Sequence, residues 1–169
     1  MIIRRATPHD AANIARLHIE SWRAAYRSEL PPSFLDNQDL AERTGIWQQR
    51  LTSSEMHVSL AENGDELLGF CAYGWSRDEN AGATWEIKNL HVRPELRRGG
   101  IGSALFETAV QAGTDTNASE LTLWVVESNL PARQFYESKG MTPDGERQRH
   151  QLTDKVFLAE IRYRMPLNR

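Results

Sequence analysis

Cysteine is almost absent from this chain of 169 residues, which contains Cys71 alone. A single cysteine excludes an intrachain disulfide and any zinc site that needs several thiolates. Cys71 lies in the apolar segment 67–73, where a small buried hydrophobic residue is a more natural interpretation than a nucleophile. We therefore expect no metal in the functional site.

Long hydrophobic runs are also missing. The longest, such as residues 123–126, fall far short of the roughly 20 apolar residues that a membrane-spanning helix needs. The first five residues lack the apolar centre of a signal peptide. These absences predict a cytoplasmic protein that does not act at a membrane.

Neither sign of charge is in large excess. The chain has 20 Lys and Arg residues against 23 Asp and Glu residues, a formal net charge of −3. No overall field therefore favours nucleic acid or anionic lipid. A local basic cluster of Arg93, Arg97 and Arg98 lacks the interleaved aromatic side chains that would favour a nucleic-acid-binding module. We expect no nucleic acid as a partner.

The length and composition fit one domain over residues 1–169. Hydrophobic residues make up 40% of the chain and charged residues 25%, as in ordinary folded domains. A chain of this length buries enough surface to fold without a disulfide or a metal. Neither repeats nor an interdomain linker divide it.

Hydrophobic periodicity and turn residues predict eleven elements, in an order that fixes the fold class. In the first half we expect a strand at 1–6, a helix that a Thr7–Asp10 capping box opens and that reaches about residue 27, and a second helix at 40–51. A three-stranded meander should follow at 56–61, 66–75 and 83–92, with a hairpin turn at Asn63-Gly64 between its first two strands. In the second half we expect a helix at 100–112, a strand at 121–126, a helix from Ser128 or Asn129 to 139 ended by Gly140, and strands at 141–152 and 156–165. The order β-α-α-β-β-β-α-β-α-β-β predicts an α/β fold with a mixed, mostly antiparallel central sheet and helices on both faces.

The segment from Asn89 to Gly102 carries the strongest chemical signal. A strand ends, two arginines and three glycines follow, and a helix begins at once. Free amides at a helix start, close-approaching glycines and nearby arginines suit a phosphate group. A P-loop would need Lys-Ser or Lys-Thr after Gly102, and a dinucleotide fingerprint would need glycine where Leu105 stands. Taken alone, the segment fits equally well a solvated arginine pair in a glycine turn.

Two motifs in this order resemble those of the GCN5-related N-acetyltransferases (GNAT family). The first is Arg97-x-x-Gly100-x-Gly102, after a strand ending in Leu90-His91-Val92. The second is Asn129-x-x-Ala132-x-x-Phe135-Tyr136-x-x-x-Gly140-Met141, with methionine in place of the more usual phenylalanine. The resemblance extends over nearly the whole chain.

The resemblance implies acetyl-CoA as cofactor, with coenzyme A as the product. The family separates the strands expected at 83–92 and 121–126, places the pantetheine arm between them, and bulges the first of these near His91 and Val92. The cofactor-binding residues that the resemblance implies are Leu90, His91, Val92, Arg97, Arg98, Gly99, Gly100, Ile101, Gly102, Ser103, Asn129, Arg133 and Tyr136.

The implied reaction is direct attack of a primary amine on the thioester, in a ternary complex. Glu86 is the candidate general base. The alternative is that Glu86 only forms an ion pair with a surface lysine or arginine on the same strand. Tyr136 matches the family's general acid, with an aromatic packing role as the alternative. His91 is a second candidate base, with a packed or solvated side chain favoured, while backbone amides near it would stabilise the thioester oxygen.

The acceptor is a small-molecule, peptide or protein amine that the sequence does not identify. We expect the N-terminal helices to select it through Trp22, Arg23, Tyr26 and Phe34, although Trp22 also continues an apolar helix face. A non-catalytic acyl-CoA-binding module is the alternative function. The presence of both Glu86 and Tyr136 favours the enzyme, and a homodimer stays open.

Overall fold

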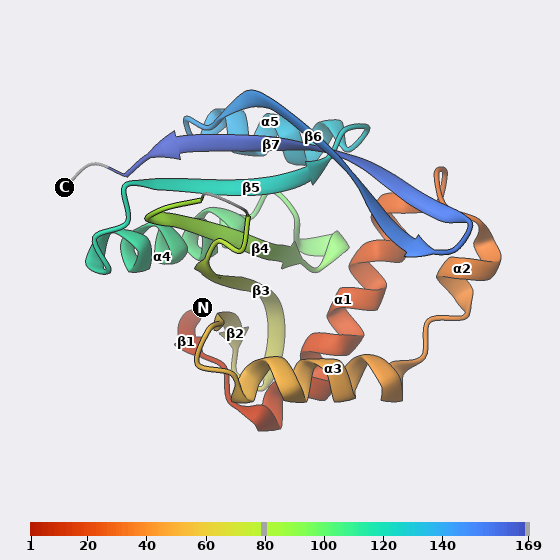
Figure 1. The fold of residues 1–169 in the computed structure, drawn as a ribbon. Coiled ribbons are helices and arrows are strands. Elements are labelled where there is room, and N and C mark those ends of the chain that lie inside the picture. Colours follow the sequence, from red (N-terminus) through yellow and green to blue (C-terminus); the bar gives the residue numbers. More distant parts are fainter. Residues whose placement is uncertain (79–80, 168–169) are drawn as a thin grey trace.

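Seven strands form one sheet in the computed structural model, which describes residues 1–78 and 81–167 (Figure 1). Their order across the sheet is β1-β2-β3-β4-β5-β7-β6. All neighbours are antiparallel except β4 and β5, which confirms the predicted mixed, mostly antiparallel sheet. The bounds are β1 (Ile2–Arg5), β2 (His57–Asn63), β3 (Glu66–Trp75), β4 (Thr84–Val92), β5 (Glu120–Val126), β6 (Thr142–Thr153) and β7 (Val156–Pro166).

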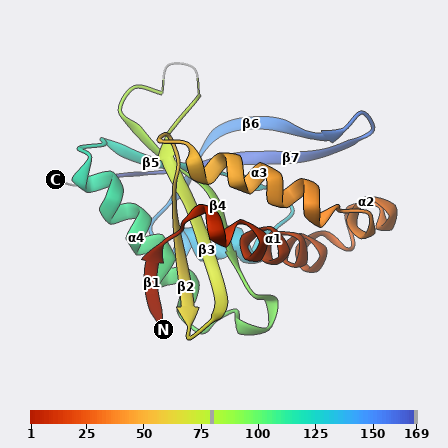
Figure 2. The ribbon, with the colours of Figure 1, turned by 90° about the horizontal axis from the view of Figure 1, so that it is seen from below.

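Helices cover both faces of this sheet, as the element order predicted. They are α1 (Ala11–Tyr26), α2 (Pro32–Asp36), α3 (Leu40–Thr52), α4 (Ile101–Asp115) and α5 (Leu130–Ser138), with single 3₁₀ turns at Pro8–Asp10 and Pro94–Leu96. The helices α1 and α3 pack on one face, around Trp47 and Phe70, and α4 and α5 pack on the other, around Leu105 and Leu121. Figure 2 shows α4 and α1 on opposite sides of β2 and β3. No helix in the described ranges is long and apolar enough to cross a bilayer.

Two local predictions for the N-terminal half are corrected by the structure. The turn between β2 and β3 is Gly64-Asp65 and not Asn63-Gly64, because Asn63 still pairs with Glu66. Gly64 has φ +61°, as the first central residue of a type II′ hairpin turn requires. The helix α2 was not predicted, because a proline pair at 31–32 is typical of a break between helices. Pro32 instead occupies the first turn of α2, where its missing N–H costs nothing.

A β-bulge shifts the phase of β4, at a different place from the one implied by the family resemblance. Tyr73 pairs with Ile87 and Ala72 pairs with Asn89, so Lys88 is the extra residue, several positions before His91. An extra residue reverses which side chains face each side of the sheet. Ile87 before the bulge and Leu90 after it therefore both pack on the α4 face.

The strands β4 and β5 separate along their length (Figure 1). They pair only from Thr84 with Glu120 to Ile87 with Leu123. Each strand residue offers its backbone groups to one neighbour or the other. Beyond Ile87, the groups of β4 that would have bonded to β5 face a gap in the sheet.

The C-terminal hairpin closes one side of this gap. Leu158 of β7 and Val126 at the end of β5 pack with Tyr26 at the end of α1, Leu30 in the connection that follows, and Leu35 in α2. This small apolar cluster joins the hairpin to the N-terminal helices, which lie far away in the sequence. The gap therefore has walls from both halves of the chain.

Two glycines in helices test the packing of this fold. A Cβ on Gly113 in α4 would lie 2.8 Å from Trp85 and 2.8 Å from Leu167, whereas nothing lies within 4 Å of one on Gly45 in α3. We expect Gly113→Ala to lower the free energy of unfolding by about 1–3 kcal/mol through overpacking. The matched Gly45→Ala should raise it by about 0.5–1 kcal/mol, because alanine is the better helix former. Urea denaturation of both variants measures the difference, and stabilisation by both would contradict the packing around Trp85.

Candidate functional site

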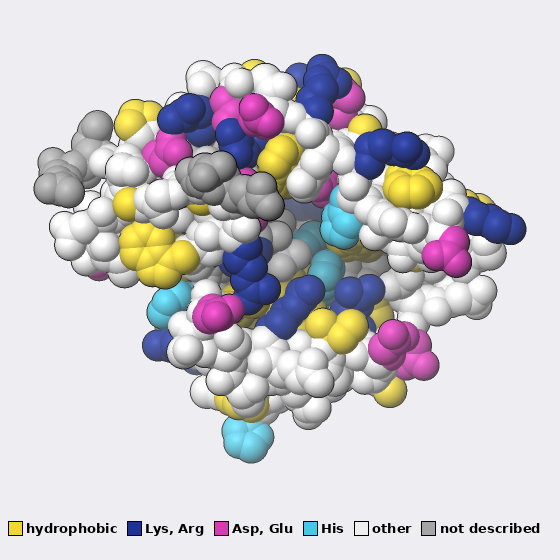
Figure 3. Space-filling model, viewed as in Figure 1, with side chains coloured by type: hydrophobic (Ala, Val, Ile, Leu, Met, Phe, Trp, Pro, Cys, Tyr) yellow, Lys and Arg dark blue, Asp and Glu magenta, His cyan; other side chains and the backbone are white. Residues whose placement is uncertain are grey.

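A cleft of about 1220 Å³ lies where β4 and β5 separate. Its walls come from β4, β5, the ends of α1 and α3, the start of α4, and α5. Figure 3 shows the hollow in the middle of one face, with basic and histidine side chains around it. The cleft is large enough for an extended cofactor together with a second substrate.

The start of α4 presents a row of unpaired backbone amides to this cleft. Arg98 (φ 68°) and Gly100 (φ 82°) both adopt the left-handed conformation, which turns successive amides toward one side. The first helical bond runs from the Ala104 amide to the Gly100 carbonyl. Within the described part of the chain, the amides of residues 97–103 donate to no protein acceptor. This arrangement suits a phosphate group.

The side chains of Arg97 and Arg98 add positive charge to this amide row. Both line the cleft, and neither has a carboxylate oxygen within 4.0 Å among residues 1–78 and 81–167. Gly100, Gly102 and Ser103 line the cleft as well, whereas Gly99 and the buried Ile101 do not.

Arg93 in the preceding segment is already engaged by the protein. Its Nε donates to the Leu67 carbonyl at 2.7 Å, and its Nη1 lies 3.1 Å from a carboxylate oxygen of Glu66. The third arginine of the basic cluster therefore holds two segments together and lies outside the cleft.

The two residues of α5 that were expected to face the cofactor point in different directions. Asn129 caps the helix by accepting from the Ala132 amide at 3.2 Å, and it lines the cleft. Arg133 lies outside the cleft, because its guanidinium donates to Tyr163 Oη at 3.1 Å and to the Glu127 carbonyl at 2.9 Å. The face of α5 toward the cleft instead carries Ala132 and Tyr136, which are one turn apart.

Tyr136 lies in the wall of the cleft with its ring buried. It packs beside Phe135 and Phe106, with ring centroids 5.3 and 6.4 Å away. Burial raises the pKa of the Tyr136 hydroxyl, which therefore keeps its proton at neutral and mildly alkaline pH. Cys71 is fully buried in the core, as predicted, and burial raises the pKa of its thiol.

Glu86 and Lys88 form an ion pair inside the cleft. The Lys88 Nζ lies 3.1 Å from Glu86 Oε2, and the side chains are only 14% (Glu86) and 15% (Lys88) exposed. The pairing that was the alternative interpretation of Glu86 is therefore present. Both residues line the cleft, so the pair lies there and not on the outer surface.

His91 is packed among aromatic rings. Its ring centroid lies 4.8 Å from that of His18 and 5.3 Å from that of Phe70. Removal from water, together with the charge of Arg97, lowers the pKa of His91 to about 4, so the ring is neutral at pH 7. A packed histidine was the favoured alternative to a second base. In the described ranges, no cluster of His, Cys, Asp and Glu residues could hold a metal ion.

Of the four candidate acceptor residues, the structure brings two to the cleft. Trp22 and Tyr26 line it with ring centroids 5.1 Å apart. Arg23 does not, because its Nε donates to the Leu35 carbonyl at 2.9 Å and holds α2 against α1. Phe34 packs behind Trp22, with ring centroids 6.5 Å apart.

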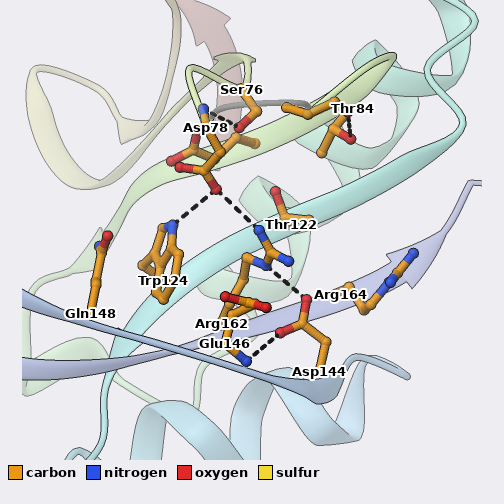
Figure 4. Close-up of polar contacts among 12 residues, drawn as sticks. Ser76, Asp78, Thr84, Thr122, Trp124, Asp144, Glu146, Gln148, Arg162 and Arg164 are labelled. Atoms are coloured by element: carbon orange, nitrogen blue, oxygen red, sulfur yellow. Dashed lines mark hydrogen bonds and ion pairs between the residues drawn. The ribbon is translucent and has the colours of Figure 1, made fainter.

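A polar network at one edge of the cleft had no signal in the sequence (Figure 4). Asp78 accepts from Trp124 Nε1 at 3.3 Å and from Arg162 Nη1 at 3.4 Å. Arg162 also donates to Asp144 at 2.7 Å. These residues are 46 and more positions away from Asp78, so only the folded chain brings them together.

Comparison with known proteins places these features in context. A family model described as "Acetyltransferase (GNAT) family" matches residues 14–141. An uncharacterized N-acetyltransferase from Archaeoglobus fulgidus is 31% identical over 143 residues, covering 83% of this chain and 92% of that protein. The PaiA N-acetyltransferase of Thermoplasma acidophilum, solved in complex with coenzyme A, shares the fold at 18% identity with a TM-score of 0.75, over 95% of this chain and 96% of that one. YncA from Salmonella typhimurium, solved with acetyl-CoA, shares it at 17% identity with a TM-score of 0.73, over 100% of this chain and 95% of that one.

The amide row at α4 predicts an anion site that depends on its arginines. Replacing both Arg97 and Arg98 by glutamine should weaken the binding of inorganic pyrophosphate by about tenfold or more, because charge-assisted hydrogen bonds are lost. Arg16→Gln is the matched control, since Arg16 lies on α1 and outside the cleft. Calorimetric titration with pyrophosphate gives the three affinities, and equal affinities would contradict the site.

Proposed function

This chain belongs to the GNAT family of acetyltransferases, and from that membership we propose that it transfers an acetyl group from acetyl-CoA to a primary amine. The observation that carries the proposal is the row of unpaired amides at residues 97–103, which opens onto the gap between β4 and β5. A diphosphate supplies the acceptors that these amides lack. Solved proteins of the same fold hold coenzyme A or acetyl-CoA, in agreement with this cofactor.

The residues around the gap fit the rest of such a cofactor. The backbone groups of β4 that face β5 have no partner on that strand beyond Ile87, and an arm containing amides could bond to them as an added strand would. Leu90 and Val92 give this edge an apolar lining on the α4 side. When bound, acetyl-CoA supplies the acetyl group as a thioester, and the proton transfers must come from this chain.

The first of these transfers concerns the amine. An alkylammonium has a pKa near 10.4, so its deprotonation at pH 7 costs about 4–5 kcal/mol. Glu86 would accept this proton, directly or through a water, because its carboxylate lies in the cleft on the strand that leads to the amide row. The Lys88 ammonium fixes the orientation of that carboxylate.

Two further groups would stabilise charge as the carbon–nitrogen bond forms and the carbon–sulfur bond breaks. Unpaired β4 amides beyond the bulge at Lys88 would donate to the carbonyl oxygen. The Tyr136 hydroxyl would donate a proton to the leaving sulfur. With reference pKa values near 8.5 for a thiol and near 10 for tyrosine, this proton transfer is about 2 kcal/mol uphill. Burial raises the pKa of Tyr136 and so makes the transfer costlier.

The proposal is tested by following thiol release from acetyl-CoA with a panel of amines. We expect release only when an amine is present, and we expect Glu86→Gln to lower it by about 10²–10⁴-fold at pH 7. The loss should shrink as the pH rises, because more of the amine is then already deprotonated. Glu107→Gln, on the outer face of α4, is the matched control. Cofactor binding without turnover on any amine would favour the non-catalytic module instead.

Tyr136→Phe separates the acid role from a packing role. The variant keeps the buried ring and removes only the hydroxyl, so acetyl-CoA affinity should be retained while kcat falls. We expect kcat to fall by about tenfold. This is less than the roughly 10²–10⁴-fold that general acid catalysis usually contributes, because a thiolate is already a tolerable leaving group. Calorimetry and steady-state rates give the two quantities, and unchanged turnover would remove the acid role.

A further inference from the structure

The acidic side chains that line the cleft are all bound by other protein groups. Asp78 is held by Trp124 and Arg162, and Glu86 is paired with Lys88. Glu160 accepts from Gln148 at 2.7 Å and lies 3.3 Å from His150, and Glu29 accepts from Ser128. The lining carboxylates therefore need no ligand to complete them.

Arg50 differs from these side chains, because nothing in the described part of the chain neutralises it. It lies half-buried in the last turn of α3 and lines the cleft. Its guanidinium lies over the Trp47 ring, 4.9 Å from the centroid. In residues 1–78 and 81–167 it donates no hydrogen bond, and no carboxylate oxygen lies within 4.0 Å of it.

The charged neighbours of Arg50 have the same sign. Burial, together with the charges of Arg43 and Arg77, lowers the pKa of Arg50. Arg77 is paired with Glu55 at 2.5 Å, and Arg43 donates to Gln38 at 3.0 Å. A partly desolvated guanidinium without an acceptor is unfavourable, and an anion that entered the cleft would complete the site.

Register across the sheet places the end of α3, which carries Arg50, at the level of Glu86 and not at the level of the amide row. His57 at the start of β2 pairs with Tyr73, and Tyr73 pairs with Ile87. The short connection from α3 to β2 therefore lies at the level of Ile87 and Glu86, two strands away from them. The amide row begins beyond Val92, which pairs with Gly69, four residues from Tyr73 along β3. At about 3.3 Å per strand residue, the amide row therefore begins more than roughly 13 Å farther along β4. Arg50 is thus suited to the acceptor and not to the cofactor diphosphate.

We propose that the amine acceptor carries a carboxylate, and that Arg50 binds it while Glu86 faces the amine. This inference rests on the proposed function and adds the chemical class of its second substrate. A guanidinium offers paired donors that match the two oxygens of a carboxylate, and stacking on Trp47 holds its plane.

Matched pairs of amines provide the test. Each ω-amino acid from β-alanine to 6-aminohexanoate is compared with the alkylamine in which hydrogen replaces the carboxylate. At saturating acetyl-CoA, kcat/KM for at least one amino acid should exceed that of its partner by about tenfold or more, as a charged hydrogen-bonded pair implies. Arg50→Gln should bring this ratio close to one, and Arg50→Lys should retain part of it.

Arg149→Gln is the control for these variants. Arg149 also stacks on an aromatic ring, with its guanidinium 4.2 Å from the centroid of Phe157, but it lies outside the cleft. This variant should keep the wild-type ratio. A ratio near one for every pair in the wild type, or a ratio unaffected by Arg50→Gln, would overturn the inference and leave the acetyltransferase proposal standing.

A second measurement keeps the two proposals distinguishable. If no compound is acetylated, the binding of each to the protein–coenzyme A complex is measured by calorimetry. Preferential binding of the amino acids that depends on Arg50 would support the carboxylate site while the proposed function fails. Equal binding, or no binding by any member of the series, would overturn the carboxylate site.

Discussion

Unpaired backbone hydrogen-bonding groups are the constraint on which this structure depends. Folded chains satisfy nearly all such groups, yet here two sets stay open beside each other: the amides of residues 97–103 and the edge of β4 beyond Ile87. Left-handed backbone at Arg98, which costs about 1–3 kcal/mol for a residue other than glycine, helps to aim the first set. A ligand with a diphosphate and an amide-containing arm satisfies both.

The bulge at Lys88 relates the surface proposed for the cofactor to the one proposed for catalysis. Without the extra residue, Leu90 would share a face with Glu86; with it, Leu90 packs on the α4 face and His91 turns toward His18 on α1. Glu86 and Lys88 stay together in the cleft as a buried pair. One inserted residue thus separates the apolar edge proposed for the cofactor from the charged region proposed for the acceptor.

Features that depend on neighbouring residues in the chain were predictable from the sequence, and those that depend on distant ones were not. The glycines before α4, the Asn129 cap and the order of the strands along the chain follow from local pattern. The orientation of Arg133 depends on Tyr163, that of Arg23 on α2, and the environment of Asp78 on Arg162. No periodicity or turn signal records contacts across such separations, and the same holds for Arg50, whose significance lies in the absence of a partner within the described chain.

The central claim is that main-chain amides at the start of α4 hold the diphosphate. Amide resonances of ¹⁵N-labelled protein during titration with coenzyme A test it most directly, with pantetheine as the ligand that lacks the diphosphate. The account predicts that the amides of residues 97–103 shift strongly with coenzyme A and only weakly with pantetheine. Saturable binding of coenzyme A that leaves these resonances in place would contradict it.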